Sequence, residues 1–189
     1  MEGKEFEMNN EVALKGEIIP NFRYSHEVFG KKFYTFDLNV NRISQNKDII
    51  PIIIEEKLLA SLSRAKKTYV EIRGKFRSYN RQEENKSKLI LYVLAQEVLE
   101  NDEEDGNNNI IFLQGFICRP VTYRKTPLGR EITDLLVAVN RPFGKSDYIP
   151  CITWGEDARN AANLEVGNKI MLYGRIQSRI YQKKYQRIR

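Results

Sequence analysis

The feature that most restricts how this chain can fold is an internal repeat. When the sequence is shifted by 99 residues without a gap, one half superimposes on the other. After a one-residue slip, the match continues with Gly74 on Gly174 and Ser78 on Ser178. The matched positions include glycines, a proline and an Asn-Arg pair: Gly16 on Gly115, Gly30 on Gly129, Val40-Asn41-Arg42 on Val139-Asn140-Arg141, and Pro51 on Pro150. Chance would not keep these residue types in one frame, so the chain is predicted to hold two copies of one module.

The two copies are predicted to be separate domains joined by a polar linker. We place the first domain at residues 1–98, an acidic and Asn-rich linker at residues 99–108, and the second domain at residues 109–189. The whole chain carries a net charge of +6, and its positive charge is concentrated in the second copy. This balance favours a polyanionic partner.

The strand pattern within each copy predicts an OB fold. Alternation of apolar and polar residues predicts first strands that end near Pro20 and Pro120, where proline removes a ladder donor. The predicted elements are first strands at 12–19 and 110–118, second strands at 33–41 and 132–140, third strands at 49–54 and 148–154, helices at 55–66 and 156–163, and fourth strands at 69–78 and 169–178. The first copy adds a fifth strand at 88–98. The predicted fold class is therefore all-β, with two tandem five-stranded Greek-key OB-fold barrels, each with a short helix between strands 3 and 4.

The second barrel is predicted to lack its last strand. The positions that match residues 88–98 would fall beyond the last residue of the sequence. An OB barrel without this strand leaves unpaired ladder edges. We expect the chain to be a fragment truncated at its C-terminal strand, and the alternative is that a partner covers the edge.

Composition and motifs argue against an enzyme. The sequence contains no phosphate-binding loop, no paired-cysteine metal motif and no nucleophile elbow. The single histidine, His26, is predicted to lie in a solvated loop, and Cys118 and Cys151 are predicted to be small core residues. With no secretory h-region, no membrane-spanning apolar run and only two cysteines, the sequence predicts a cytoplasmic, nucleoid-associated protein. We expect no catalytic residues, no cofactor and no metal.

Aromatic and basic residues of the second copy predict a surface for a single-stranded nucleic acid. Tyr148 and Trp154 are separated by an even number of strand positions, so both point to one face of the sheet. The predicted base-stacking residues are Phe143, Tyr148, Trp154 and Tyr181, and the predicted phosphate-binding residues are Arg119, Arg124, Lys125, Arg130, Arg141, Lys145, Arg175, Arg179, Lys183 and Lys184. On the pattern alone, burial of these rings in a core remains the alternative.

The second copy resembles the bacterial single-stranded DNA-binding protein family. The resemblance covers nearly all of residues 109–183. It rests on residues 109–115, Arg119-Pro120 with Tyr123, and residues 137–141, 147–155, 158–163, 167–169 and 173–179. It implies an OB fold in which the stacking rings lie at the four aromatic positions named above. In the first copy those positions hold Ser44, Ile49, Glu55 and approximately Arg81, so this copy is degenerate and is expected to serve assembly.

The resemblance implies a protein that coats and protects single-stranded DNA in replication, recombination and repair. Family members commonly assemble four OB domains, so two chains are expected to form a homodimer, with replication or repair proteins as possible further partners. Family members usually end in an acidic, hydrophobic tail tip that recruits replication and repair enzymes, whereas this sequence ends in the basic residues Arg187-Ile188-Arg189. If that is the natural end, recruitment in this way is not expected; if the chain is a fragment, nothing follows from it. Two alternatives remain open: an OB-fold protein-interaction adaptor of the primosome or mobile-element type, and an RNA-binding OB protein.

Overall fold

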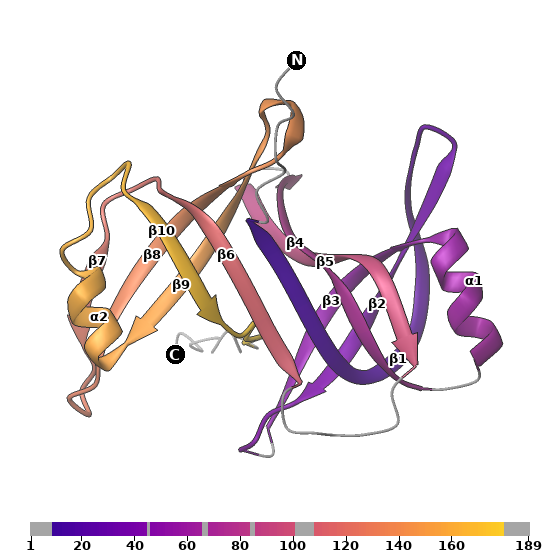
Figure 1. Cartoon of the computed structure of the whole chain (residues 1–189), viewed down its shortest axis with the longest axis horizontal. Coiled ribbons are helices and arrows are strands. Elements are labelled where there is room, and N and C mark those ends of the chain that lie inside the picture. Colours follow the sequence, from indigo (N-terminus) through magenta and orange to yellow (C-terminus); the bar gives the residue numbers. More distant parts are fainter. Residues whose placement is uncertain (1–8, 45, 66–67, 84–85, 101–107, 180–189) are drawn as a thin grey trace, which may run out of the picture.

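The computed structural model describes residues 9–44, 46–65, 68–83, 86–100 and 108–179. Figure 1 shows two barrels side by side, with strands β1 and β6 adjacent at the centre and helices α1 and α2 at opposite ends. Within the described residues, no helix is long and apolar enough to cross a membrane.

The first barrel is closed by five strands. Its elements are β1 (Asn10–Val28), β2 (Lys31–Asn41), β3 (Lys47–Glu55), α1 (Glu56–Ala65), β4 (Tyr69–Glu83) and β5 (Lys86–Glu100). Strand β1 pairs with β2 and β4, β3 pairs with β2, and β5 lies parallel to β3 and antiparallel to β4. The helix lies between the third and fourth strands, so the predicted OB-fold order is confirmed.

The second barrel has the same order of elements, with β6 and β7 together at the positions that match β1, but it is not closed. Its elements are β6 (Asn109–Ile117), β7 (Thr122–Lys125), β8 (Glu131–Asn140), β9 (Ser146–Trp154), α2 (Gly155–Ala161) and β10 (Lys169–Gly174). Strand β8 pairs with β6, β7 and β9, and β10 pairs with β6. In the part of the chain that the structure describes, no strand joins β9 to β10.

Matched glycines of the two barrels show that β10 has no neighbouring strand of the kind that β5 provides for β4. A Cβ atom added to Gly74 would lie 2.1 Å from the carbonyl oxygen of Leu94 in β5, whereas Gly174 has no such neighbour within 4 Å. A Cβ atom on Gly16 would lie 2.5 Å from the carbonyl oxygen of Asn39, and one on Gly115 would meet Ala138 at the same distance. Gly16 and Gly115 recur because strands approach too closely there for any side chain.

Two local predictions were wrong. Strand β1 does not end at Pro20 but continues to Val28, with register shifts between Ile19 and Arg23 and between Tyr24 and His26. Irregular pairing of this kind tolerates a residue that lacks a donor. His26 consequently lies in β1 rather than in a loop, and its ring stacks on Phe33 with the centroids 4.9 Å apart.

The predicted linker begins inside a strand. Leu99 and Glu100 belong to β5, and Asn109 already belongs to β6. Asn108 is buried, and its carbonyl oxygen accepts the Lys15 N–H at 2.8 Å. Residues 101–107 of the predicted linker lie outside the described residues.

The two barrels are joined by an antiparallel strand pair with pseudo-two-fold symmetry. In the pairing of β1 with β6, Asn10 lies opposite Leu113 and Leu14 lies opposite Asn109. In the repeat, Asn10 matches Asn109 and Leu14 matches Leu113, so the two pairs are equivalent. The pseudo-two-fold axis therefore passes between the paired residues Val12 and Ile111. Side chains from both barrels form one continuous buried cluster, which makes the joint part of the hydrophobic core.

Candidate nucleic-acid interface

The outward face of β9 is a row of exposed apolar side chains. Tyr148, Ile152 and Trp154 expose 46%, 38% and 44% of their surface, and Pro150 between them is also exposed. The alternate residues face inward: Ile149, for example, is buried. The structure therefore places Tyr148 and Trp154 on one solvent-facing side of the strand, as the period of two requires.

Phe143 lies in the short connection between β8 and β9 and is fully exposed. Its backbone is in the left-handed region with φ of 63°, and Gly144 follows with φ of 70°. This conformation is rare for a bulky residue and marks a constrained turn. The loop is closed at its base, where the Arg141 N–H donates to the Lys145 carbonyl oxygen at 2.7 Å. The turn thus holds an apolar ring out in water in the connection that leads into β9.

Five of the predicted phosphate-binding residues are exposed cations: Arg119, Arg130, Lys145, Arg175 and Arg179. Their side chains make no hydrogen bond or ion pair within the described residues. Arg124 and Lys125 instead pair with Asp134 at 2.9 Å and Glu131 at 3.7 Å. Both pairs are solvent-exposed, so they contribute little stability and can exchange for a phosphate.

The carboxylate of Glu131, which pairs with Lys125, also accepts two hydrogen bonds. Tyr123 donates its hydroxyl to Glu131 at 2.6 Å, and Arg159 pairs with the other carboxylate oxygen. The hydrogen bonds from Tyr123 and Arg159 lower the pKa of Glu131, so it remains an anion. The pKa of the Tyr123 hydroxyl is raised in turn by its hydrogen bond to this carboxylate.

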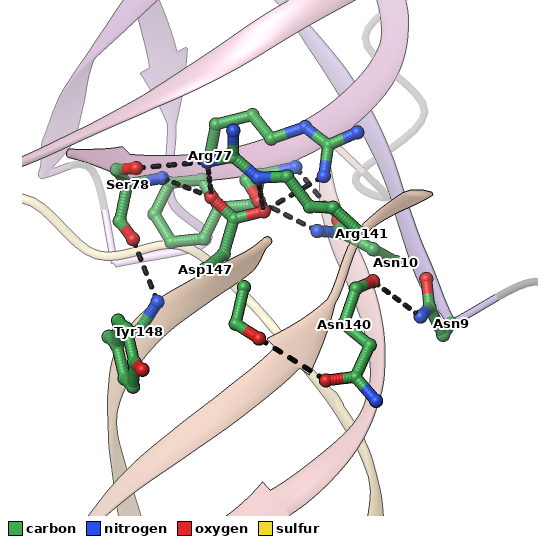
Figure 2. A network of polar contacts seen from close by, with 10 residues as sticks. Asn9, Asn10, Arg77, Ser78, Asn140, Arg141, Asp147 and Tyr148 are labelled. Atoms are coloured by element: carbon green, nitrogen blue, oxygen red, sulfur yellow. Dashed lines mark hydrogen bonds and ion pairs between the residues drawn. The ribbon is translucent and has the colours of Figure 1, made fainter. Parts of the chain in front are cut away.

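Arg141 is placed differently from the other predicted cations. Its guanidinium pairs with the buried carboxylate of Asp147 and donates to the Ser78 carbonyl oxygen at 3.0 Å (Figure 2). The hydrogen bond to Asp147 raises the pKa of Arg141. The guanidinium is therefore engaged in a network between the barrels. The sequence analysis did not predict this network. The available signal was that the repeat matches Asp48 with Asp147 and Ser78 with Ser178.

The remaining predicted residues lie outside the described residues: Tyr181, Lys183 and Lys184. At the matching positions of the first barrel, Ile49 is 43% exposed, and neither Ser44 nor Glu55 supplies a ring. The first barrel carries its rings at other positions, on β1, β2, β4 and β5. There Tyr24 meets Tyr34 edge to face, and Phe36 is fully buried in the core.

Neither cysteine presents a reactive thiol. Burial raises the pKa of Cys151 to about 12, so its thiol stays protonated at neutral pH. Cys118 is half-buried, and its Sγ lies 3.2 Å from the carbonyl oxygen of Leu136. Among the described residues, no group of three or more His, Cys, Asp or Glu side chains is arranged to hold a metal ion.

This is an OB-fold protein. Its first barrel is closed by five strands, a helix follows β3 and β9, and aromatic rings are exposed on β9. Residues 108–188 match the Single-strand binding protein family. The match spans β6 to β10, the strands of the second barrel.

Similar proteins in bacteria carry the corresponding name. The single-stranded DNA-binding protein of Halalkalibacterium halodurans is 38% identical over 80 residues, which cover 39% of this chain and 48% of that protein. Single-stranded DNA-binding protein A of Bacillus subtilis is 35% identical over 81 residues, covering 39% of this chain and 47% of the relative. The chain thus spans about half the length of the curated relatives it matches.

One solved structure extends the likeness in fold to both barrels. The crystal structure of the wild-type single-stranded DNA binding protein from Thermus aquaticus superimposes with a TM-score of 0.71. The match covers 89% of this chain and 84% of that chain at 18% sequence identity. Because the covered share exceeds either barrel alone, the tandem arrangement of the two barrels is common to both proteins.

Proposed function

We propose that this protein binds single-stranded DNA through its second barrel and has no catalytic activity. The observation that carries the proposal is the outward face of β9, where Tyr148 and Trp154 are exposed, together with the exposed Phe143 in the connection that leads into this strand. Single-stranded bases are flat and apolar on both faces, and stacking one on an aromatic ring contributes about 1–3 kcal/mol. A duplex hides those faces, so such a surface selects unpaired strands.

Exposed cations supply the second part of the mechanism. Arg119, Arg130, Lys145, Arg175 and Arg179 track the phosphates, and Arg124 and Lys125 join them by exchanging their carboxylate partners. We assign the same roles to Tyr181, Lys183 and Lys184, but we remove Arg141 from the phosphate-binding set because Asp147 holds it. Affinity should fall as salt rises, since binding releases condensed counterions.

The emission of the single tryptophan tests this proposal. Trp154 fluorescence is followed while an oligo-dT strand is titrated, with a duplex of equal phosphate content as the control. We expect strong quenching by the single strand alone. An unchanged spectrum, or equal quenching by the duplex, would refute stacking on β9. Competition with a matched RNA strand decides between DNA and RNA as the partner.

We further infer that the chain self-associates into a homodimer through the outer face of β6 and β10. Met171 and Tyr173 of β10 expose 67% and 82% of their surface, and Tyr173 packs on Phe112 with ring centroids 4.8 Å apart. Ile110 and Phe116 extend the apolar surface along β6. Contiguous exposed apolar surface of this kind marks an interaction site.

The corresponding face of the first barrel, on β1 and β4, carries charged side chains instead of apolar ones. Glu11 lies opposite Phe112 across the β1–β6 pair, and it forms an ion pair with Lys75. A Tyr173→Glu substitution should convert the dimer to a monomer in light scattering, whereas Arg73→Glu on the charged part should not. A wild-type chain that is monomeric at micromolar concentration would contradict the inference.

The proposed cellular role follows from the proposed ligand. Coating exposed strands protects them during replication, recombination and repair, and we place the protein at the nucleoid in the cytoplasm, where its ligand occurs. Contacts with replication or repair proteins belong to the same proposal.

A further inference from the structure

A buried carboxylate at the start of β9 is held from both barrels. Asp147 is fully buried and accepts hydrogen bonds from Arg141 of its own barrel and from Arg77 and Ser78 of the first barrel (Figure 2). Arg77 donates at 2.8 Å and the Ser78 N–H at 2.6 Å. Burial of a carboxylate is costly unless cations and donors surround it, so these contacts determine where Asp147 sits.

The same strand of the first barrel also holds the next residue of β9. The Ser78 hydroxyl accepts the backbone N–H of Tyr148 at 2.8 Å. Two consecutive residues of β4 therefore hold two consecutive residues of β9, and the second of these carries the exposed ring. Arg77 itself is mostly buried, with 16% of its side chain exposed.

Asp147 also controls the loop that carries Phe143. Arg141 and Asp147 bracket this loop, and their ion pair closes it together with the hydrogen bond from Arg141 N–H to the Lys145 carbonyl oxygen. A shift of Asp147 would therefore move both the Phe143 loop and the first ring of β9. The pair Arg77 and Ser78 acts on two stacking positions through one carboxylate.

The pseudo-two-fold mate of this network is missing one contact. Asp48 pairs with Arg42 and accepts the Ser178 N–H at 2.7 Å, and the Ser178 hydroxyl accepts the N–H of Ile49 at 3.0 Å. The position that matches Arg77 is Gln177. Among the described residues, the hydrogen bonds to Asp48 come from Arg42 and Ser178 and not from Gln177. The extra arginine thus occurs on the side where the strand carries Tyr148, and it is absent where the strand carries Ile49.

We propose that Arg77 and Ser78 are positioning residues of the DNA site, through which the first barrel orients the stacking rings of the second. The proposal rests on the single-stranded DNA binding proposed above. It gives the first barrel a role in recognition without any ring of its own at the matching positions. The buried cluster that the two barrels share holds them in the fixed relation that such positioning requires.

The test compares two arginines of the same strand. Arg77→Gln places at this position the residue that its pseudo-symmetric mate already tolerates, and Asp147 keeps Arg141 and the Ser78 N–H. Arg73→Gln is the matched control, because Arg73 also lies in β4 but pairs with Glu71 on the exposed side at 2.6 Å. Both variants lose one positive charge. Oligo-dT is titrated against each at several salt concentrations, and thermal unfolding is recorded alongside.

We expect Arg77→Gln to bind oligo-dT about tenfold more weakly, the loss that follows from misplacing one stacked base. Its salt dependence should equal that of the wild type, and Arg73→Gln should bind within about twofold of the wild type. Equal affinities of the two variants would overturn the proposal. A salt slope reduced by about one would also overturn it, because Arg77 would then contact a phosphate directly.

A double-mutant cycle tests whether the effect passes through the rings. In a Phe143→Ala/Tyr148→Ala background, Arg77→Gln should cause no further loss of affinity, and a fully additive loss would contradict positioning. Ser78→Ala removes only the acceptor of the Tyr148 N–H and should weaken binding about threefold, with the exposed helix substitution Ser61→Ala as its control. It also keeps the proposal testable if Arg77→Gln fails to fold. A wild-type protein that does not bind oligo-dT would instead refute the proposed function itself.

Discussion

Removing the carboxylate of Asp48 should reveal how strongly the two barrels hold each other. Asp48 is fully buried, pairs with Arg42, and accepts the N–H of Ser178 from the second barrel at 2.7 Å. Asp48→Ala would leave the Arg42 guanidinium without its carboxylate and the Ser178 N–H without its acceptor. Breaking a buried ion pair from one side costs about 3–5 kcal/mol. Because Arg42 keeps 16% of its side chain in contact with solvent, we expect the low end, about 3 kcal/mol.

Strand β3 supplies the matched control. Glu55 lies at the other end of β3 and pairs with Lys31 at 3.1 Å, but the side chains are 29% and 62% exposed. Exposed pairs contribute about 0–1 kcal/mol, so Glu55→Ala should stay within that range. The free energy of unfolding is measured by urea denaturation followed by circular dichroism. If Asp48→Ala lost less than about 1 kcal/mol, or no more than Glu55→Ala, the network would not join the barrels and the argument would fail.

Three further predictions concern acid, the stacking face and the barrel glycines. Burial alone would raise the pKa of Asp48, but hydrogen bonds from Arg42 and Ser178 hold it below the ordinary value of 3.8. The stability that ionised Asp48 contributes is therefore present above that pH and is lost as the pH falls through the lower folded pKa. Urea denaturation at pH 7 and near pH 3 should show a loss of stability in acid that Asp48→Ala reduces. Trp154→Ala should weaken oligo-dT binding by about 1–3 kcal/mol in fluorescence anisotropy with an unchanged melting temperature, and equal affinity would exclude this ring from the site. Gly16→Ala should destabilise the fold by about 1–3 kcal/mol because its Cβ would meet the Asn39 carbonyl oxygen, whereas Gly174→Ala has open space and should be neutral in the same thermal melt.

The fold could be predicted from the sequence because its signals are local and are repeated. Alternating burial along β9, for instance, follows directly from the alternation of Tyr148, Ile149 and Pro150. The exposed positions of Tyr148 and Trp154 follow from the same period of two. The prediction failed at Pro20, because a strand with irregular pairing can continue past a residue that a regular ladder would reject.

The candidate site was predicted less completely, and Arg141 shows why. In the sequence it is one basic residue among several in a positively charged copy, and nothing near it in the chain reports its partners beyond Asp147. Its contact with the Ser78 carbonyl oxygen joins residues 63 positions apart, and Arg77 reaches Asp147 across 70 positions. Contacts of that range depend on how β1 and β6 pair.

The sequence by itself determined two OB-fold copies and which of them carries the rings, because strand periodicity, turn glycines and the repeat are properties of neighbouring residues. Only the tertiary structure decided that the barrels share one core and that Asp48 and Asp147 are each held from the opposite barrel. The physical reason is that a buried carboxylate must find its donors wherever the packed strands bring them. That choice is made by the β1–β6 pairing about the pseudo-axis, which no local pattern encodes.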